Sequence, residues 1–299
     1  MLSFLSAGRQ GGAGVSQASR IETGGFVFDA LVEGPEEGAL VLLLHGFAES
    51  LHTWRGQLPA LAGAGFRAVA PSQRGYSVGA RPDARDPHNY HFDRLVEDAM
   101  AVAAACCAAG RRFHLVGHDW GGSLAWGIAD RHPEKLASLT VLSRPHPNAF
   151  NRALALPDGE QQHRSRHHRE FLLPDAASVV LADEARWLRE RWDASGVPAA
   201  AQAEHLSVLG NLEAMEAALA WYRARGAIRS PLGLIRVPTL YLWGDADDTV
   251  GRPAAEWTRD FVAAPYRFAV LPGVGHFTAD QAPDAVNALL LGHLARYPV

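Results

Sequence analysis

The sequence predicts an α/β fold whose sheet is mostly parallel and doubly wound. Short apolar runs alternate with amphipathic segments along most of the chain, which is typical of strands alternating with helices. One apolar run, Phe113 to Val116, leads through Gly117-His118-Asp119-Trp120-Gly121-Gly122 directly into a helical pattern. From residue 146 to residue 230 the alternation stops and only helical segments are apparent. These observations predict a layered core with a helical insertion.

The expected division of the chain follows from the same pattern. Residues 19–145 and 231–299 should form the core, and residues 146–230 should form a helical cap inserted after the sixth strand. Residues 1–18 are rich in Gly, Ser and Ala, so we expect a flexible leader there. Ligands bind at the carboxyl ends of the strands in open α/β sheets, and a cap should lie over that edge.

The individual elements are predicted from apolar periodicity and from turn residues. The expected strands, beginning with a hairpin joined at Gly24-Gly25, are Arg20–Thr23, Phe26–Val32, Ala39–Leu44, Phe66–Ala70, Phe113–Val116, Leu136–Leu142, Val237–Trp243 and Phe268–Leu271. The expected helices are Thr53–Ala62, Asp93–Ala109, Ser123–Ala129, Glu160–Leu172, Ala176–Leu181, Asp183–Trp192, Ala200–Leu209, Leu212–Arg223, Ala254–Val262 and Pro283–Arg296.

Composition excludes several function classes. The 299 residues carry a net charge of −4, and they show no basic patch that would indicate a nucleic-acid or anionic-membrane partner. No apolar stretch approaches the length that spans a bilayer, and we expect no secretory signal at the start. Cys106 and Cys107 are neighbours in one helix and cannot easily pair, which favours a reduced, cytoplasmic setting. The expected partner is a small molecule, and a homodimer is left open.

Asp119 is the candidate nucleophile. It lies at the centre of a Gly-x-Asp-x-Gly turn between a strand and a helix, where a nucleophile elbow holds its side chain on a strained backbone. Taken alone, the motif favours a simpler interpretation, in which Asp119 only caps the helix. The residues that accompany it reverse that preference.

Two later loops supply an acid and a base. His276 follows the last predicted strand, and an acidic loop with Asp245, Asp247 and Asp248 follows the strand before it. The chain order of nucleophile, acid and histidine is that of hydrolases with an elbow. The backbone N–H groups of Phe47, in His45-Gly46-Phe47, and of Trp120 could together form an oxyanion hole.

These motifs resemble the soluble epoxide hydrolase family of the α/β-hydrolase superfamily, which is related to the haloalkane dehalogenases. The residues that carry the resemblance are His45-Gly46-Phe47, Gly117 to Gly122, Trp221-Tyr222-Arg223 and Gly275-His276-Phe277. The resemblance implies that Asp119 attacks an epoxide to form an ester and that water activated by His276 hydrolyses the ester to release a vicinal diol. It implies no cofactor and no metal.

The resemblance also assigns the remaining roles. The spacing between Asp247 and Val250 matches the family's acid, which makes Asp247 the expected orienter of His276 and Asp248 the second choice. Tyr222 matches one of the two cap tyrosines that protonate the departing alkoxide, and His167 occupies the place of the other. An alternative for His167 is a metal site with His163 at i, i+4, although no strong third ligand lies nearby in the sequence.

Two other functions stay open at this point. A haloalkane or haloacid dehalogenase would use the same Asp119, and Trp120 with the cap residues Trp187 or Trp192 could hold a halide. A non-catalytic binding protein with the same fold is the third alternative. A full set of nucleophile, acid, base and oxyanion donors argues against it, because a binding protein needs none of them.

Overall fold

The computed structural model describes residues 17–224 and 232–299, and it confirms the predicted fold class. Eight strands form one sheet in the order β1-β2-β4-β3-β5-β6-β7-β8. The strands are β1 (Gln17–Thr23), β2 (Phe26–Glu33), β3 (Leu40–Leu44), β4 (Arg67–Pro71), β5 (Phe113–His118), β6 (Leu136–Leu142), β7 (Thr239–Gly244) and β8 (Tyr266–Leu271). Only the pairings β1–β2 and β2–β4 are antiparallel.

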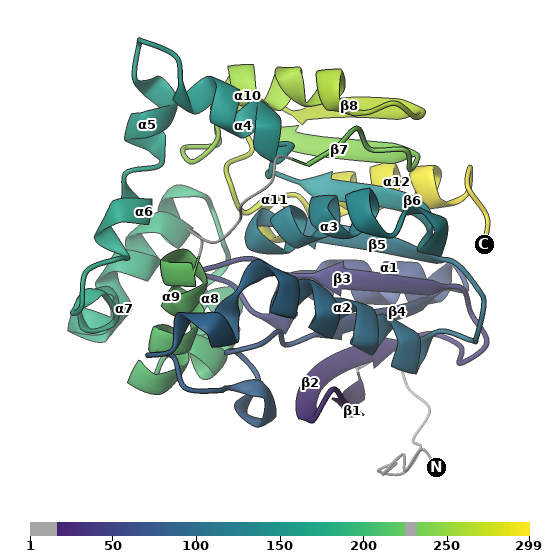
Figure 1. The fold of residues 1–299 in the computed structure, drawn as a ribbon, viewed down its shortest axis with the longest axis horizontal. Coiled ribbons are helices and arrows are strands. Elements are labelled where there is room, and N and C mark those ends of the chain that lie inside the picture. The colour runs from purple at the N-terminus through teal and green to yellow at the C-terminus, as the bar shows by residue number, and fades with distance from the viewer. Residues whose placement is uncertain (1–16, 225–231) are drawn as a thin grey trace.

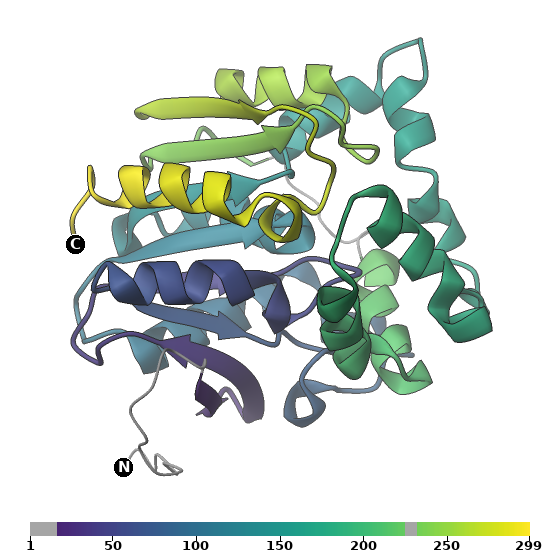
Figure 2. The same ribbon diagram turned by 180° about the vertical axis from the view of Figure 1, so that it is seen from behind.

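Helices cover both faces of this sheet. Figures 1 and 2 show α2 and α3 on one face and α1 and α12 on the other. The helices and 3₁₀ turns of this part are η1 (Leu51–Gly56), α1 (Gln57–Gly63), η2 (Val78–Ala80), η3 (Pro87–Tyr90), α2 (Phe92–Cys106), α3 (Asp119–Arg131), η4 (Pro133–Lys135), α10 (Arg252–Trp257), η6 (Thr258–Phe261), α11 (Thr278–Gln281) and α12 (Pro283–Leu294).

The continuous apolar strands are buried because each contributes to two cores. In β3, Leu42 and Leu44 belong to the hydrophobic cluster that includes α2 and α3, whereas Val41 and Leu43 belong to the cluster that includes α1 and α12. All four side chains are fully buried. Period-two alternation therefore sends successive residues of one strand to opposite faces, both of them covered.

Among its described residues, the segment between β6 and β7 contains helices and one isolated β-bridge at Ile235 but no strand. Most of these helices gather beyond one edge of the sheet (Figure 1). These helices are α4 (Pro147–Leu154), α5 (Glu160–Arg164), α6 (His167–Glu170), α7 (Ala176–Ala194), α8 (Ala199–Leu209) and α9 (Leu212–Ala224). We refer to residues 146–224 as the cap helices. The proposed domain boundary near residue 230 lies outside the described residues, and the division into core and cap stays a prediction.

The local details of the cap differ from the predicted elements. The helix expected over Glu160–Leu172 is divided into α5 and α6, and α4 was not predicted. The two helices expected around Asp183 follow one another as α7, whose backbone is non-helical from Ala182 to Ala185. Asp183, Glu184 and Ala185 have positive φ angles, so the expected interruption is present as a kink.

The predicted leader is too long by two residues. Gln17 and Ala18 belong to β1, where they pair with Val32 and Leu31 of β2. These backbone pairings order the start of the strand, which a composition argument cannot detect. The rest of the leader, residues 1–16, lies outside the described residues. Within the described part of the chain, none of the helices has the length and hydropathy needed to cross a bilayer.

Candidate active site

The predicted elbow is a sharp turn between β5 and α3. Asp119 begins α3 with a φ of 46°, a left-handed conformation that strains a residue with a side chain. A Cβ on Gly121 would lie 2.1 Å from the carbonyl oxygen of Leu44, and a Cβ on Gly117 would lie 2.4 Å from that of Gly121. The glycines are therefore required because the backbones approach too closely for any other residue.

The Asp119 carboxylate is buried and its two oxygens have different surroundings. The Phe47 N–H donates a hydrogen bond to Oδ1 at 3.1 Å, while Oδ2 lies 3.7 Å from Nε2 of His276. Gly46 permits this approach, since a Cβ there would meet the Asp119 Cβ at 2.5 Å. No hydrogen bond from the Trp120 N–H to Asp119 is found, although Trp120 is in the first turn of α3, where N–H groups lack intrahelical acceptors.

His276 and Asp247 form a buried pair. Nδ1 of His276 lies 3.1 and 3.0 Å from the two Asp247 oxygens, and the Asp247 side chain is fully buried. The backbone N–H groups of Thr249 and Val250 donate to Asp247 Oδ1 at 2.8 and 3.0 Å. Asp248 instead is exposed and lies 3.5 Å from Arg191. The geometry thus brings Asp247, and not Asp248, to the histidine.

Charge interactions determine the protonation of the pair formed by Asp119 and His276. Burial opposes ionisation of both groups, but His276 holds the pKa of Asp119 well below its ordinary value. Asp247 and Asp119 in turn raise the pKa of His276 well above its ordinary value. With Asp119 ionised, the imidazole is therefore held as a cation between two carboxylates at neutral pH.

Two side chains hold the main-chain carbonyl group of His276. His118 is the last residue of β5, and Ser143 directly follows the neighbouring strand β6. The His276 carbonyl oxygen accepts hydrogen bonds from Nε2 of His118 at 2.8 Å and from Oγ of Ser143 at 2.7 Å. His118 also donates from Nδ1 to Glu49 at 2.6 Å, and Glu49 accepts from the Gly46 N–H at 3.0 Å. Burial opposes charge on His118, but Glu49 raises its pKa. Both nitrogens of His118 face acceptors, so the ring fits the buried site as a cation.

Tyr222, on α9, contacts the residues that flank the elbow. Its ring centroid lies 5.4 Å from that of Phe47 and 5.1 Å from that of Trp120, both with edge-to-face geometry. Phe171 packs against it at 4.9 Å. The side chain is buried, as expected for a group that faces a closed site. The structure therefore brings the predicted cap tyrosine to the elbow.

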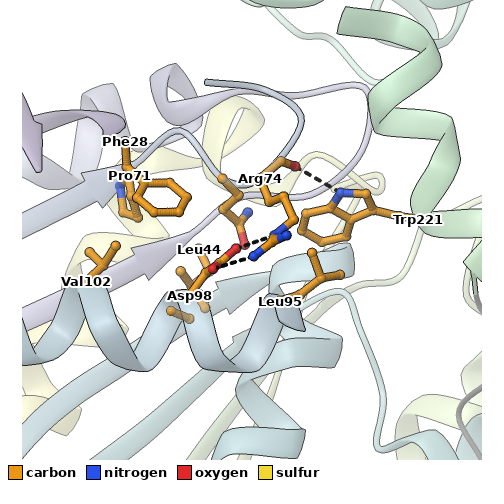
Figure 3. A pocket seen from close by; sticks show the side chains of 10 residues that line it. Phe28, Leu44, Pro71, Arg74, Leu95, Asp98, Val102 and Trp221 are labelled. Atoms are coloured by element: carbon orange, nitrogen blue, oxygen red, sulfur yellow. Dashed lines mark hydrogen bonds and ion pairs between the residues drawn. The ribbon is translucent and has the colours of Figure 1, made fainter. Parts of the chain in front are cut away.

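The residue before Tyr222 fastens α9 to the core. The Trp221 indole N–H donates to the carbonyl oxygen of Arg74 at 3.0 Å (Figure 3). Arg74 is fixed by Asp98, which accepts from Nε at 2.5 Å and from Nη2 at 2.7 Å. This bidentate pair lines a small pocket with Leu95 and Trp221. The Trp221–Arg74 hydrogen bond helps to position Tyr222, and the pocket itself contains none of the candidate catalytic residues.

His167 and His168 both lie near Tyr222. The His168 ring centroid is 5.4 Å from that of Tyr222, and the His167 centroid is 6.5 Å away. Burial lowers the pKa of His167 to about 4, so its imidazole is neutral at pH 7. Among the described residues, no partner is found for its buried Nδ1. The His167 ring also packs against Phe171 at 5.5 Å, and Phe171 packs against Phe47 at 4.9 Å, so His167 lies beside the site.

The two cap tryptophans considered for halide binding make contacts within the protein. The Trp192 indole N–H donates to the carbonyl oxygen of Ala48 at 2.9 Å, and Trp187 packs against Phe171 and Arg191. Trp192 is therefore engaged and does not offer its N–H to a halide. Residues 17–224 and 232–299 contain no group of three His, Cys, Asp or Glu side chains that could hold a metal.

Comparison with known proteins establishes the superfamily. A model of the alpha/beta hydrolase fold family matches residues 39–283. AB hydrolase superfamily protein YfhM of Bacillus subtilis is 30% identical over 281 residues, which cover 92% of this chain and 96% of that protein.

Further similarities narrow this assignment. Epoxide hydrolase 3 of Xenopus tropicalis is 30% identical over 288 residues, covering 91% of this chain and 75% of the relative. The chain belongs to the epoxide hydrolase family. A solved epoxide hydrolase from metagenomes of hot environments covers 93% of this family member with a TM-score of 0.82 and 28% identity. The similarity covers 98% of that structure, so it includes the segment of the cap helices.

In this epoxide hydrolase family member, sequence reasoning missed Glu49, Ser143 and Arg144. All three follow the carboxyl end of a buried strand, β3 or β6, within a few residues. That position is a usable signal, because polar residues at this edge of a parallel sheet face the ligand site. Contacts with the main chain of His276, in contrast, come from distant segments and leave no local pattern in the sequence.

Proposed function

We propose that the protein hydrolyses small-molecule epoxides to vicinal diols through an ester on Asp119. The observation that carries this proposal is an aspartate at the elbow, with its carboxylate near His276 and with Tyr222 packed against both residues beside it. A carboxylate attacks an alkyl carbon, whereas an ordinary carboxylic-ester hydrolase needs a hydroxyl or thiol nucleophile at this place. The epoxide hydrolases among the relatives support the same reaction class.

In the proposed first half-reaction, Asp119 Oδ2 attacks one oxirane carbon and the ring C–O bond breaks. Phe47 holds Oδ1, so Oδ2 is the oxygen left free to attack. The departing alkoxide takes a proton or strong hydrogen bonds from Tyr222, with His167 as the second donor from its neutral N–H. Removal of charge by these donors is needed because an alkoxide is too basic to form unaided in a dry site.

In the second half-reaction, His276 removes a proton from water and the water attacks the ester carbonyl carbon. Esterification removes the negative charge of Asp119, which is one of the groups that raise the pKa of His276. The pKa of the histidine therefore falls when the intermediate forms. The ring then releases its proton, which replaces, through solvent, the hydroxyl proton that Tyr222 gave to the alkoxide, and the neutral imidazole can act as the base. The oxyanion develops on Oδ1, where the N–H groups of Phe47 and Trp120 stabilise it by about 3 kcal/mol each. When this species collapses, its C–O bond to the substrate breaks and the His276 imidazolium protonates the released alkoxide to complete the diol. The proton left on the Asp119 carboxyl group passes to the ring, which regenerates the carboxylate and the imidazolium.

The activity is tested with the purified protein and two neutral substrates, a styrene-oxide-like epoxide and a haloalkane of similar size. Diol formation from the epoxide, measured by chromatography, is the expected result. Release of halide without any diol would replace the proposal by dehalogenation. Turnover of neither compound, with ligand-dependent stabilisation only, would favour a binding protein.

Replacing Tyr222 by Phe is expected to slow alkylation by an epoxide about 10²-fold, the size of a general-acid contribution. The ring contacts with Phe47 and Trp120 persist in this variant, so a loss reports on the hydroxyl. Stopped-flow measurement of the first half-reaction gives the rate. Unchanged epoxide turnover in Tyr222→Phe would remove Tyr222 from the mechanism.

Removal of His167 should have a smaller effect than removal of Tyr222. His167→Ala is expected to slow alkylation about tenfold, because Tyr222 still supplies one donor. His168→Ala is the matched control, since it removes a neighbouring imidazole whose ring also contacts Tyr222. A larger loss in His168→Ala than in His167→Ala would assign the second donor to His168.

Asp247→Asn is expected to reduce ester hydrolysis about 10⁴-fold. In this variant the amide oxygen must keep accepting from the Thr249 and Val250 N–H groups. The amide NH₂ group then faces His276 and donates to Nδ1. The neutral ring therefore carries its proton on Nε2, which is the wrong tautomer for a base. Single-turnover measurements should show normal alkylation followed by slow release of diol. Asp248→Asn is the control and should leave both steps unchanged. A damaged Asp248→Asn variant with a normal Asp247→Asn variant would reverse the assignment of the acid.

A further inference from the structure

Arg144 lies in the candidate active site and has no role in the proposed mechanism. It follows β6 by two residues, and only 8% of its surface is exposed. Its guanidinium lies 4.4 Å over the ring of Phe150, on α4. A Cβ on Gly122 would meet the Arg144 Cβ at 2.8 Å, which shows that the side chain starts against the first turn of α3, beside Asp119.

The guanidinium of Arg144 has no hydrogen-bonding partner among the described residues. Over the described parts of the chain, its guanidinium makes no hydrogen bond or ion pair, and its Nε is buried without an acceptor. Arg74 is buried to the same degree, but it makes two bonds to Asp98 and donates from Nη1 to the Asn89 carbonyl oxygen at 3.0 Å. Because burying an unpaired cation is costly, the contrast indicates that Arg144 is kept for a ligand.

The guanidinium charge acts on the reacting groups. Burial lowers the pKa of Arg144, while the Asp119 carboxylate is the largest charge that opposes this change. Arg144 also lowers the pKa of Asp119, so the interaction is mutual. Phe150, which lies under the guanidinium, is 6.3 Å from the ring of His168, and His168 in turn contacts Tyr222. A chain of ring contacts thus connects the guanidinium of Arg144 with Tyr222, so the cation lies next to the candidate site.

We infer that Arg144 binds a carboxylate of the substrate, which makes the substrate an epoxide with a carboxylate group close to the ring. This inference rests on the proposed function. A planar guanidinium with free donors matches a carboxylate in a bidentate arrangement, and stacking on Phe150 fixes its plane. Arg144 is then a specificity-determining residue, and its contact with the substrate persists through both half-reactions.

The test compares 3-phenyloxirane-2-carboxylate with the corresponding carboxamide, which has the same shape and no charge. The parent protein should show a kcat/KM about 10²-fold higher for the acid. Arg144→Gln should abolish this preference, with acid turnover falling much more than amide turnover. Arg152→Gln is the matched control, because Arg152 lies on exposed α4 surface and pairs with Asp260. It should retain the preference.

An unchanged acid-to-amide ratio in Arg144→Gln would overturn the inference, and so would equal turnover of both compounds by the parent. A uniform loss on both substrates would instead make Arg144 a general electrostatic residue. If neither epoxide gives a diol, the proposed function fails. The inference about Arg144 is then tested by ligand binding, measured as a change in Tm. The dihydroxy acid should raise the Tm of the parent and of Arg152→Gln but not of Arg144→Gln, whereas the dihydroxy amide should have little effect. A parent protein whose Tm the acid does not raise contradicts a carboxylate site even if Arg144→Gln fails to fold.

Discussion

Replacing Asp119 by Ala is expected to abolish epoxide hydrolysis, with a loss of about 10⁶-fold, the size reported when a nucleophile is removed from a triad. The variant retains the Phe47 N–H, His276 and Asp247 but has no atom that can attack the oxirane. Alanine at a φ of 46° also adds some strain, so the Tm should fall slightly rather than the protein unfold. Initial rates of diol formation and thermal unfolding together measure both effects.

The role of Asp119 can be separated from simple electrostatics by isotope labelling. In single turnover in ¹⁸O water, the label should enter the Asp119 carboxylate, because water attacks the ester at the enzyme's own carbonyl carbon. Asp130→Ala is the control variant, since it removes another carboxylate of α3, one that accepts from the Gly233 N–H and lies outside the candidate site. Direct appearance of the label in the diol during the first turnover would contradict the ester mechanism.

His276→Gln is expected to convert the enzyme into one that reacts once with its substrate. Alkylation uses Asp119 and the cap donors, whereas hydrolysis needs a base, so the ester should accumulate while steady-state turnover falls about 10⁶-fold. Intact-protein mass spectrometry should show a mass increase equal to that of the epoxide, and peptide mapping should locate it at Asp119.

His205→Gln is a suitable control for this experiment. His205 is a buried histidine of α8 that bonds to Ser50 and Asp280 and does not contact Asp119, His276 or Tyr222 in the described contacts. It should turn over substrate without accumulating an adduct. Failure of a folded His276→Gln protein to form any adduct would mean that the histidine acts before the ester exists.

The parts of the fold that the sequence predicted well are those in which local pattern and tertiary environment agree. Ala39–Leu44 is apolar throughout because both faces of β3 are covered, so its periodicity could be interpreted without knowledge of its neighbours. The elbow was equally accessible, since its glycines are required by short contacts within the same strand–turn–helix unit and with β3. The order of the strands in the sheet, in contrast, depends on pairings that no single segment encodes.

The cap and the electrostatics of the site were less accessible to sequence reasoning. The division of Glu160–Leu172 into two helices and the kink at Ala182–Ala185 occur inside stretches with good helical periodicity, so packing must override local preference there. The position of Arg144 after β6 was a usable signal, but only the folded structure shows that its guanidinium makes no hydrogen bond or ion pair with the described residues. The choice between Asp247 and Asp248 likewise required the direction of each side chain, which the structure supplies.

In the proposed mechanism, the Trp221–Arg74 hydrogen bond affects the rate of the first half-reaction, because it holds α9 and therefore Tyr222 in place. Tyr222 and His167 come from the cap helices, whereas Asp119, Asp247 and His276 come from the segments around the sheet. Displacement of α9 would therefore slow the pre-steady-state burst and leave the breakdown of a formed intermediate intact. Variants that loosen this anchor should never trap an adduct, whereas variants of the loop around Asp247 should. Two rate constants of one catalytic cycle thus depend on separate segments of the chain, and substitutions can change each one without the other.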